Sequence, residues 1–371
     1  MKLLHLYSGN LYGGIERLLG ALNRLQSAYP DLTHSYGLSF RGKLWDELSR
    51  DGARVHDLGN VRARYPWSVL RARRRLSKAL QADRPDVVIC HTPWPHAIYG
   101  GMLRRANVRF ATYFHDQPHE SNPLDRWAAR TPADCSIANS AHTASRIAPL
   151  FSAPRVQIVY CPSEPSTTEL NAAERDRFRQ SLDANALDVV FLQAGRFERW
   201  KGLHIFMESL VLLKDVPGWK AWIGGEPQKS GEFTYLSELQ ALATHGGISE
   251  RVRFIGWRSD MSKVMQAADV FCQPNTGPEP FGLVFTEALA HGLPVIATTL
   301  GGALEIVTRE CGILVAPGDA KAVASSLLDL LQDPALRARL AKHGPQRARQ
   351  LVDPVTQLAA LHRVLGRLEH T

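Results

Sequence analysis

The first 160 residues alternate between short apolar runs and longer amphipathic stretches. Helix-type periodicity fills the stretch 15–25 and another stretch that ends at Arg105. The apolar runs between them have the length of strands and cover residues 2–7, 86–90, 109–114, 134–140 and 155–160. Strand-length runs separated by helices are typical of βαβ units, whose neighbouring strands are parallel. The pattern predicts a first domain with a parallel sheet over residues 1–165.

The alternation restarts at residue 189. Strand-length runs cover residues 189–195, 220–225, 251–256, 269–274, 294–298, 305–307 and 312–317. Helical patterns separate most of these runs, which predicts a second doubly wound α/β domain over residues 189–350. Residues 166–188 open with Pro, Ser and Thr and continue as a charged helical stretch, so they are predicted to link the two domains.

The final residues, 351–371, follow a Val-Asp-Pro break and predict an amphipathic helix. Its apolar face is formed by Leu358, Leu361, Val364, Leu365 and Leu368. A stripe of large apolar side chains is unfavourable in water, so this helix is expected to pack on other parts of the chain.

Length and composition agree with two globular domains. The chain has 371 residues, of which 44% are hydrophobic and 22% charged, and this balance excludes disordered and fibrous classes. No stretch reaches the ~18 apolar residues of a membrane-spanning helix, and the first residues become polar too early for a signal peptide. The five cysteines are scattered without a Cys-x-x-Cys pair. They argue against a disulfide framework or a zinc site and favour a cytoplasmic location.

Positive charge is concentrated early in the chain. The formal net charge is +8, with +9 in residues 1–150 and −1 in the remainder. The most basic stretch contains Arg62, Arg64, Arg71, Arg74, Arg75 and Lys78 and no acid. With Tyr65 and Trp67 beside these cations, the stretch could bind the inner face of an anionic membrane, or it could be a solvated helix face. A nucleic-acid partner is not expected, because no nucleic-acid-binding motif accompanies the charge.

Two short motifs follow predicted strands. Gly13 and Gly14 stand between the first strand and the first helix, where backbone amides can approach an anion, although such pairs often only mark a turn. Arg196 and Lys201 follow the first strand of the second domain. Two cations at the carboxyl end of a strand suit a diphosphate, and a solvated basic loop is the alternative.

A third motif, EPFGLVFTE, sets Glu279 and Glu287 around a helix that is predicted to start at Pro280. The glycine in the stretch 281–283 keeps the amides there approachable for an anion or a hydroxyl. A nucleotide sugar has a ribose and a hexose on either side of a diphosphate, so two hydroxyl-binding carboxylates around an anion-binding helix start match it. Alone, each acid could equally be an ordinary helix or surface residue.

In this order, GRFERWKG, EPFGLVFTEALAHGLPVIATTLGGALEIV and GILVAPGD resemble the C-terminal half of family 4 glycosyltransferases, whose E-x7-E element would be Glu279 and Glu287. Over the first domain the resemblance rests on YGGIE, ATYFHD and IANS. The resemblance implies a GT-B fold, in which two Rossmann-like domains face a central cleft and the last helix returns to the first domain. It also implies retaining transfer from a nucleotide-diphosphate sugar without a metal, and the chain contains no Asp-x-Asp triplet.

The resemblance also implies roles for the residues that match it. Arg196 and Lys201 would neutralise the departing diphosphate, and Glu279 would bind the donor sugar. His115, in ATYFHD, would position the donor sugar without acting as a base. The remaining donor contacts would come from Gly13, Gly14, Phe281, Gly282, Leu283 and Glu287, the last of them to the ribose.

The sequence therefore predicts a retaining glycosyltransferase with a saccharide or lipid-linked acceptor in the synthesis of cell-envelope polysaccharide or glycolipid. A UDP-sugar is preferred as donor over GDP-mannose. The alternatives are a sugar-nucleotide epimerase or hydrolase of the same fold, which would need further acid or base residues, and a non-catalytic partner subunit. The presence of Arg196, Lys201, Glu279 and Glu287 together argues against the last of these.

Overall fold

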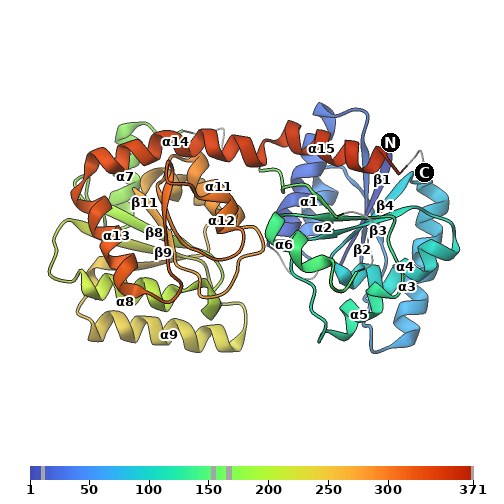
Figure 1. Cartoon of the computed structure of the whole chain (residues 1–371), viewed down its shortest axis with the longest axis horizontal. Coiled ribbons are helices and arrows are strands. Elements are labelled where there is room, and N and C mark those ends of the chain that lie inside the picture. Colours follow the sequence, from blue (N-terminus) through green and yellow to red (C-terminus); the bar gives the residue numbers. More distant parts are fainter. Residues whose placement is uncertain (10–12, 152–155, 164–168, 369–371) are drawn as a thin grey trace. The chain divides into compact units, whose positions relative to one another are not determined.

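The computed structural model of the chain describes residues 1–9, 13–151, 156–163 and 169–368. The chain divides into two compact units, which Figure 1 shows in the colours of the sequence. The first unit comprises Met1–Glu164 together with Val352–Thr371, and the second comprises Pro165–Leu351. Each unit is built on its own parallel sheet, which confirms the α/β class predicted from the alternating pattern.

The first unit has a seven-stranded sheet with the order β3-β2-β1-β4-β5-β6-β7. Its strands are β1 (Lys2–Tyr7), β2 (Thr33–Leu38), β3 (Arg54–Asp57), β4 (Val87–His91), β5 (Phe110–Phe114), β6 (Cys135–Ala138) and β7 (Val156–Ile158). Its helices are α1 (Gly14–Arg24), the 3-10 helix η1 (Leu25–Ala28), α2 (Lys43–Arg50), α3 (Pro66–Asp83), α4 (Pro93–Arg105), α5 (Pro123–Ala129), α6 (Ala141–Ile147) and α15 (Pro354–Gly366). The strand order reverses at β1, and in such sheets ligands bind at the carboxyl ends of the strands.

The apolar pattern predicted five strands of this sheet, β1, β4, β5, β6 and β7. Every residue of β4 (VVICH) and β5 (FATYF) is buried. The neighbouring strands β2 (THSYGL) and β3 (RVHD) were not predicted, because polar side chains interrupt their apolar residues. β2 nevertheless pairs with β1 along its whole length. Neighbouring strands thus supply the ordering that the local sequence of β2 does not show.

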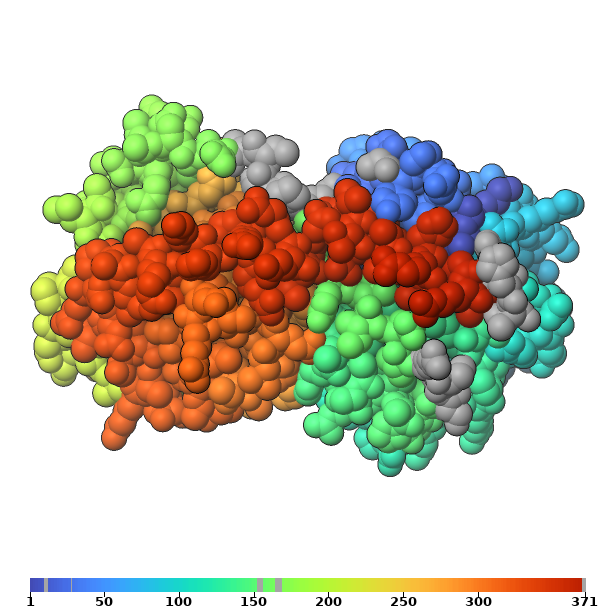
Figure 2. All heavy atoms as spheres, turned by 45° about the horizontal axis from the view of Figure 1, so that its top comes forward, coloured from blue at the N-terminus to red at the C-terminus, as the bar shows by residue number. Residues whose placement is uncertain are grey.

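The C-terminal helix α15 belongs to the first unit. It buries Leu358, Leu361 and Leu365, as its apolar stripe predicted. The backbone N–H of Tyr160 donates to Oε1 of Gln357 at 3.0 Å, which joins the helix to the segment after β7. Figure 2 shows the red helix on the surface of this unit, with its outer side open to solvent.

The second unit has a six-stranded sheet with the order β10-β9-β8-β11-β12-β13. Its strands are β8 (Val189–Ala194), β9 (Trp219–Gly224), β10 (Val252–Gly256), β11 (Val270–Gln273), β12 (Val295–Thr298) and β13 (Gly312–Val315). Its helices are α7 (Ala172–Ser181), η2 (Arg199–Lys201), α8 (Leu203–Leu212), α9 (Ser230–His245), η3 (Ser249–Arg251), α10 (Met261–Ala267), α11 (Leu283–Ala290), α12 (Ala303–Ile306), α13 (Ala320–Gln332) and α14 (Pro334–Val352). The run 305–307, expected to be a strand, instead ends the short helix α12.

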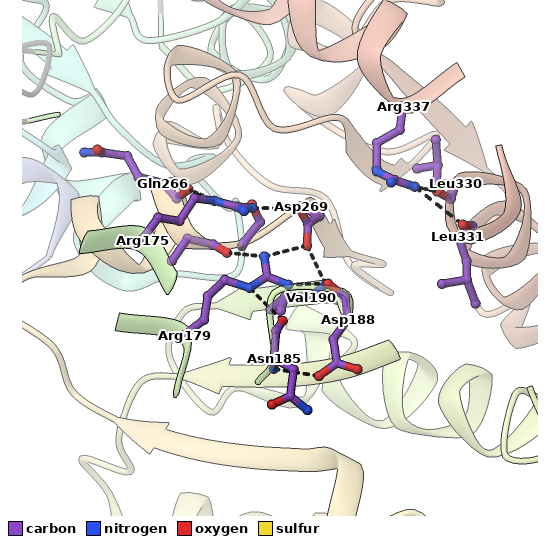
Figure 3. A network of polar contacts seen from close by, with 12 residues as sticks. Arg175, Arg179, Asn185, Asp188, Val190, Gln266, Asp269, Leu330, Leu331 and Arg337 are labelled. Atoms are coloured by element: carbon purple, nitrogen blue, oxygen red, sulfur yellow. Dashed lines mark hydrogen bonds and ion pairs between the residues drawn. The ribbon is translucent and has the colours of Figure 1, made fainter. Parts of the chain in front are cut away.

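The stretch expected to be a linker, residues 166–188, is part of the second unit. Residues 166–168 lie outside the described residues, and half of the rest forms α7. Figure 3 shows how α7 is held: Arg175 and Arg179 both pair with Asp269, at 2.8 and 3.0 Å. Asp269 also accepts from the N–H of Val190 at 2.7 Å, at the start of β8. The charged helix that was predicted to be part of a linker is therefore fixed to the sheet by a buried arginine.

Within the described ranges, no helix is long and apolar enough to cross a membrane. All five cysteines are buried free thiols. Packing of the two sheets against their helices supplies the cores of both units.

Candidate functional site

The candidate site of the second unit lies at the carboxyl ends of β8 and β11, which are neighbours at the point where the strand order reverses. The chain leaves β8 through Arg196 and the 3-10 helix η2, which ends at Gly202. Gly202 has a φ of +70°, and a Cβ there would lie 1.8 Å from the carbonyl oxygen of Pro274. Only glycine allows the loop after β8 to pass so close to the loop after β11.

This close approach brings Lys201 and Glu279 together in an ion pair between Nζ and Oε2. Both side chains are largely buried, with exposed fractions of 11% and 13%. The same carboxylate oxygen accepts from Nδ2 of Asn275 at 3.2 Å and lies 3.5 Å from Nε2 of Gln273. The ammonium also lies 4.2 Å from the centre of the Trp200 ring. The pair is thus surrounded by polar and aromatic groups that hold both charges in place.

Further contacts fix the backbone around Glu279. The N–H of Gly302 donates to the carbonyl oxygen of Glu279 at 2.8 Å, and Oγ1 of Thr298 donates to the carbonyl oxygen of Asn275 at 2.8 Å. The sequence analysis missed Gln273, Asn275 and Gly302. Gln273 could have been found from the sequence, because it is a polar residue at the end of an otherwise apolar strand, VFCQ.

The helix after Glu279 begins later than predicted. α11 starts at Leu283 with Gly282 as its N-cap, so Pro280 and Phe281 precede the helix. Gly282 has a φ of +107°, a backbone conformation that favours glycine and turns the chain into the helix. The N–H of Leu283 comes before the first intrahelical hydrogen bond, as expected for an anion-binding position. Glu287 lies within α11 and is partly buried.

Arg196 lies on the same loop as Lys201 but has a different partner. Its Nη1 pairs with Oε1 of Glu198 at 3.0 Å, and its side chain is 46% exposed. The structure therefore joins Lys201 to Glu279 and leaves Arg196 on the exposed part of the loop, where its guanidinium remains accessible to an anion.

In the first unit, the glycine pair after β1 meets a buried acid. Gly13 is the N-cap of α1, and its N–H donates to Oε2 of Glu16 at 2.9 Å. The other carboxylate oxygen of Glu16 accepts from the hydroxyl of Tyr7 at 2.8 Å. The N–H of Gly13, which was expected to contact a phosphate, thus donates its hydrogen bond to a carboxylate of the protein itself. Gly14 is the first residue of α1 and is exposed.

His115 directly follows β5 and ends a chain of hydrogen-bonded histidines across the sheet. Nδ1 of His34 lies 2.8 Å from Nε2 of His5, and Nδ1 of His5 lies 2.8 Å from Nε2 of His91. Nδ1 of His91 lies 2.9 Å from Nε2 of His115, whose Nδ1 lies 3.8 Å from Sγ of Cys161. The histidines follow the spatial strand order β2-β1-β4-β5, and the sequence analysis did not predict this chain.

Burial keeps these histidines neutral. It lowers the pKa of His34 to about 4 and that of His115 to about 3, and it lowers the pKa values of His5 and His91 well below the ordinary 6.5. His5 and His91 each use both ring nitrogens, and a neutral ring donates from one nitrogen and accepts at the other, so the hydrogen bonds between the four rings run in a single direction. Nε2 of His34, at the first ring, is buried without a hydrogen-bond partner among the described residues. Both ring nitrogens of His115 have partners, and its side chain is only 8% exposed.

The basic stretch of the first unit forms α3 and a preceding loop. The helix buries Val69, Ala72, Leu76 and Ala79, which confirms the predicted apolar face. The helix exposes the predicted cations Arg71, Arg74, Arg75 and Lys78, and the preceding loop exposes Arg62 and Arg64. Tyr65, Trp67 and Leu70 are also exposed, by 49%, 78% and 47%. Apolar and basic side chains therefore lie together on one open surface.

Among the residues that the structure describes, no three or more His, Cys, Asp or Glu side chains form a group that could hold a metal ion.

Two family profiles match the chain one after the other. The profile described as Glycosyltransferase Family 4 matches residues 12–166, and the profile described as Glycosyl transferases group 1 matches residues 174–347. The first match covers the strands of the first sheet other than β1, and the second match covers the whole of the second sheet with the Lys201 and Glu279 loops.

Two of the curated relatives are glycosyltransferases of lipopolysaccharide core biosynthesis. The lipopolysaccharide core biosynthesis glycosyltransferase LpsE of Rhizobium meliloti (strain 1021) is 32% identical over 212 residues, which are 57% of this chain and 58% of LpsE. LpsD of the same organism, also a lipopolysaccharide core biosynthesis glycosyltransferase, is 24% identical over 353 residues, 94% of this chain and 93% of LpsD. The chain spans about half the length of several of the curated relatives it matches.

The solved structures of HepE from Anabaena resemble the whole chain. Its complex with UDP and glucose has a TM-score of 0.86 at 26% identity and covers 99% of this chain and 100% of HepE. Its complex with UDP-glucose has a TM-score of 0.85 at 25% identity. This similarity agrees with two Rossmann-like domains of the GT-B class. With one profile on each of its two parallel-sheet units, the chain belongs to the family 4 glycosyltransferases.

Proposed function

We propose that this protein is a retaining glycosyltransferase that moves a sugar from a nucleotide-diphosphate sugar to a saccharide or lipid-linked acceptor of the cell envelope. The observation that carries the proposal is the buried pair of Lys201 and Glu279 at the carboxyl ends of β8 and β11, with Arg196 on the same loop. Family membership and the similarity to HepE, which binds UDP and glucose, support it.

In this proposal, the loop before α11 and the helix itself bind the donor. Glu287 accepts hydrogen bonds from the ribose hydroxyls, and Glu279 accepts them from the sugar. The N–H groups of Phe281, Gly282 and Leu283 contact sugar and phosphate oxygens near the positive end of the helix. Lys201 already compensates the negative charge of Glu279. The negatively charged diphosphate of the donor can therefore bind near this carboxylate with less electrostatic repulsion.

Lys201 and Arg196 provide the electrostatic part of catalysis. As the bond between the sugar and the diphosphate breaks, negative charge grows on the phosphate oxygens, and two nearby cations stabilise it. They would supply the charge stabilisation that a metal gives in other enzymes. In a front-face retaining reaction, the departing phosphate oxygen accepts the proton of the acceptor hydroxyl, so the proposal needs no side-chain base.

The first unit contributes positioning residues. Gly14, at the exposed start of α1, approaches a phosphate oxygen in this proposal, whereas the N–H of Gly13 remains with Glu16. His115 is held by His91 and Cys161, so it acts as part of the wall at the carboxyl end of β5 rather than through a free ring nitrogen.

A UDP-sugar is the proposed donor, and the complexes of HepE with UDP and with UDP-glucose support this choice. A thermal-shift panel of UDP, GDP and their sugars, with and without magnesium, tests it, because a ligand that binds only the folded state raises the melting temperature. We expect UDP compounds to stabilise the protein in EDTA. Stabilisation by GDP compounds alone would overturn the choice of donor, and a strict magnesium requirement would overturn the metal-free mechanism.

The proposed acceptor is linked to a lipid or to the envelope, and α3 is proposed to bring the enzyme to an anionic membrane surface. The exposed cations and the aromatic side chains Tyr65 and Trp67 support this, since both kinds of group favour the membrane interface. Sedimentation with phosphatidylglycerol vesicles tests it. Binding should fall in the double variant Arg74→Gln/Lys78→Gln and should be weak on phosphatidylcholine vesicles. Equal binding to both lipids would contradict the proposal.

A further inference from the structure

A pocket of about 610 Å³ lies in the first unit, apart from the residues assigned to the donor. Phe40, Arg41, Leu58, Gly59 and Asn60 reach it from the segments that follow β2 and β3, and Ser68, Arg71 and Arg75 reach it from the first half of α3. It therefore lies at the carboxyl ends of two parallel strands, the edge at which α/β sheets bind ligands. Its volume is in the range of small-molecule sites.

Charged groups dominate the walls of this pocket. Asp57 is its one acidic residue, and three arginines face it. Asp57 holds two of them, with Oδ2 2.9 Å from Nη2 of Arg41 and Oδ1 3.3 Å from Nη1 of Arg75. Oδ1 also accepts from the N–H of Gly59 at 2.7 Å. The carboxylate thus fixes the arginines on either side of it and leaves the pocket with an excess of positive charge.

The third arginine, Arg71, has no ion pair or hydrogen-bond partner within the part of the chain that the structure describes. It lies one helical turn before Arg75 on α3, so both guanidinium groups are on the same side of the helix. Ser68 lies one turn earlier on that side, and its hydroxyl is fixed by the carbonyl oxygen of Tyr65 at 2.7 Å. An ordered pocket with one unpaired guanidinium is arranged to receive an anion.

We propose that this pocket binds a phosphate or carboxylate group carried by the acceptor, with Arg71 as the principal contact and Arg41 and Arg75 as supporting charges. The inference rests on the proposed function, because it assigns the pocket to the second substrate of the transfer. It makes the acceptor an anionic saccharide or a saccharide next to a lipid phosphate.

The pocket differs from the membrane-binding surface proposed for the same helix. Arg74 and Lys78 are exposed on α3 without lining the pocket, whereas Arg71 and Arg75 line it. In a contact with a flat membrane, each exposed cation contributes a similar free energy of binding, because lipid headgroups are mobile. A pocket with fixed arginines depends on Arg71 far more than on Arg74. The pair Arg71 and Arg74 therefore separates the two modes of binding.

The experiment compares Arg71→Gln with the matched control Arg74→Gln in the full chain. Isothermal titration calorimetry with glucose 6-phosphate, inorganic phosphate and uncharged glucose measures binding of a soluble anion. Co-sedimentation with phosphatidylglycerol vesicles measures binding of a lipid phosphate. UDP stabilisation is measured on the same samples, since UDP is proposed to bind the second unit and should be unaffected by both variants.

We expect glucose 6-phosphate to bind about tenfold more weakly to Arg71→Gln and less than about twofold more weakly to Arg74→Gln, with little binding of glucose. If only the vesicles bind and Arg71→Gln weakens that binding clearly more than Arg74→Gln does, the anion is a lipid phosphate and the pocket assignment stands. Equal effects of the two variants on every anion, or binding of none, would overturn it. If UDP stabilisation persists in that case, only the pocket assignment fails, whereas its absence in the wild type removes the proposed function as well.

Discussion

Lys201 and Glu279 form a buried ion pair although they are 78 positions apart in the chain. Two glycines make this possible. Gly202 lets the loop after β8 pass against Pro274, and Gly302 donates its N–H to the carbonyl oxygen of Glu279. In the proposed mechanism, this ammonium stabilises the departing diphosphate and this carboxylate binds a hydroxyl of the donor sugar.

Lys201→Ala should lower kcat by about 10²- to 10³-fold, because one cation that stabilises the departing diphosphate is lost. The affinity for UDP should change much less, since Glu287 and the backbone amides remain. Steady-state kinetics and calorimetry measure the two effects. Lys214→Ala, an exposed lysine after α8, is the matched control and should behave as the wild type. Unchanged turnover in Lys201→Ala would remove this residue from the mechanism.

Glu287→Ala should weaken UDP binding by about tenfold or more, because a carboxylate that binds two ribose hydroxyls makes charge-assisted hydrogen bonds. Titration calorimetry with UDP measures the loss. The control is Glu310→Ala, an exposed acid after α12 in the same unit. Titration with 2′,3′-dideoxy-UDP adds a sharper test, since the wild type should bind it about as weakly as Glu287→Ala binds UDP. Equal UDP affinity in the variant and the wild type would contradict the assignment.

Arg179→Ala should destabilise the second unit by about 3–5 kcal/mol, because it leaves Asp269 with one partner fewer and removes a fully buried cation. The guanidinium also donates to the carbonyl oxygens of Asn185, Ala267 and Asp188, which would lose this donor. Differential scanning calorimetry should show the transition of the second unit at lower temperature. Arg177→Ala, exposed on the same helix, should leave it unchanged. Similar melting of both variants would show that the network contributes little.

The histidine chain should make the first unit sensitive to acid. The folded-state pKa values of His34 and His115, about 4 and 3, lie below the ordinary 6.5, so the unfolded chain binds more protons at acidic pH. The free energy of unfolding should therefore be constant above pH 6.5 and fall below it. Each histidine that stays neutral contributes a slope of about 1.4 kcal/mol per pH unit. The fall continues to about pH 4 for His34.

Urea unfolding of the first unit at pH 7 and pH 5 measures this slope. His34→Gln should reduce the slope of the free energy of unfolding against pH by about the contribution of one histidine, because glutamine does not titrate. His245→Gln, on the exposed surface of the second unit, is the control. A free energy of unfolding that is the same at both pH values would contradict the conclusion that the four histidines are buried in their neutral form.

The sequence predicted the parts of the fold that local patterns encode. Strands such as VVICH and FATYF are apolar throughout, because a parallel sheet is covered on both faces, and this pattern is visible without a structure. β2 and β3 could not be found this way, since polar residues interrupt their apolar pattern; His34 and Ser35 of β2 are nevertheless buried, and β3 is only partly buried at the edge of the sheet. The burial of Arg179 likewise depends on Asp269, which lies 90 positions away.

The same distinction applies to the residues of the candidate site. Lys201, Glu279 and Glu287 stand in motifs that can be recognised from spacing and residue type. The contacts of Gln273 and Asn275 with Glu279 could not be predicted, because they arise only when the loops meet. The histidine chain depends on the strand order β2-β1-β4-β5, which differs from the order in the sequence. Contacts between distant segments are therefore what the sequence leaves open.

The most direct test of the central claim is proton NMR of the product formed from UDP-glucose in EDTA, with a lipopolysaccharide core saccharide as acceptor. UDP-glucose has an α-linked sugar, so a retaining, metal-independent transfer predicts a new α-anomeric signal together with release of UDP. Lys201→Ala should slow both signals in parallel. A β-linked product, or transfer that occurs only when magnesium is added, would contradict the account.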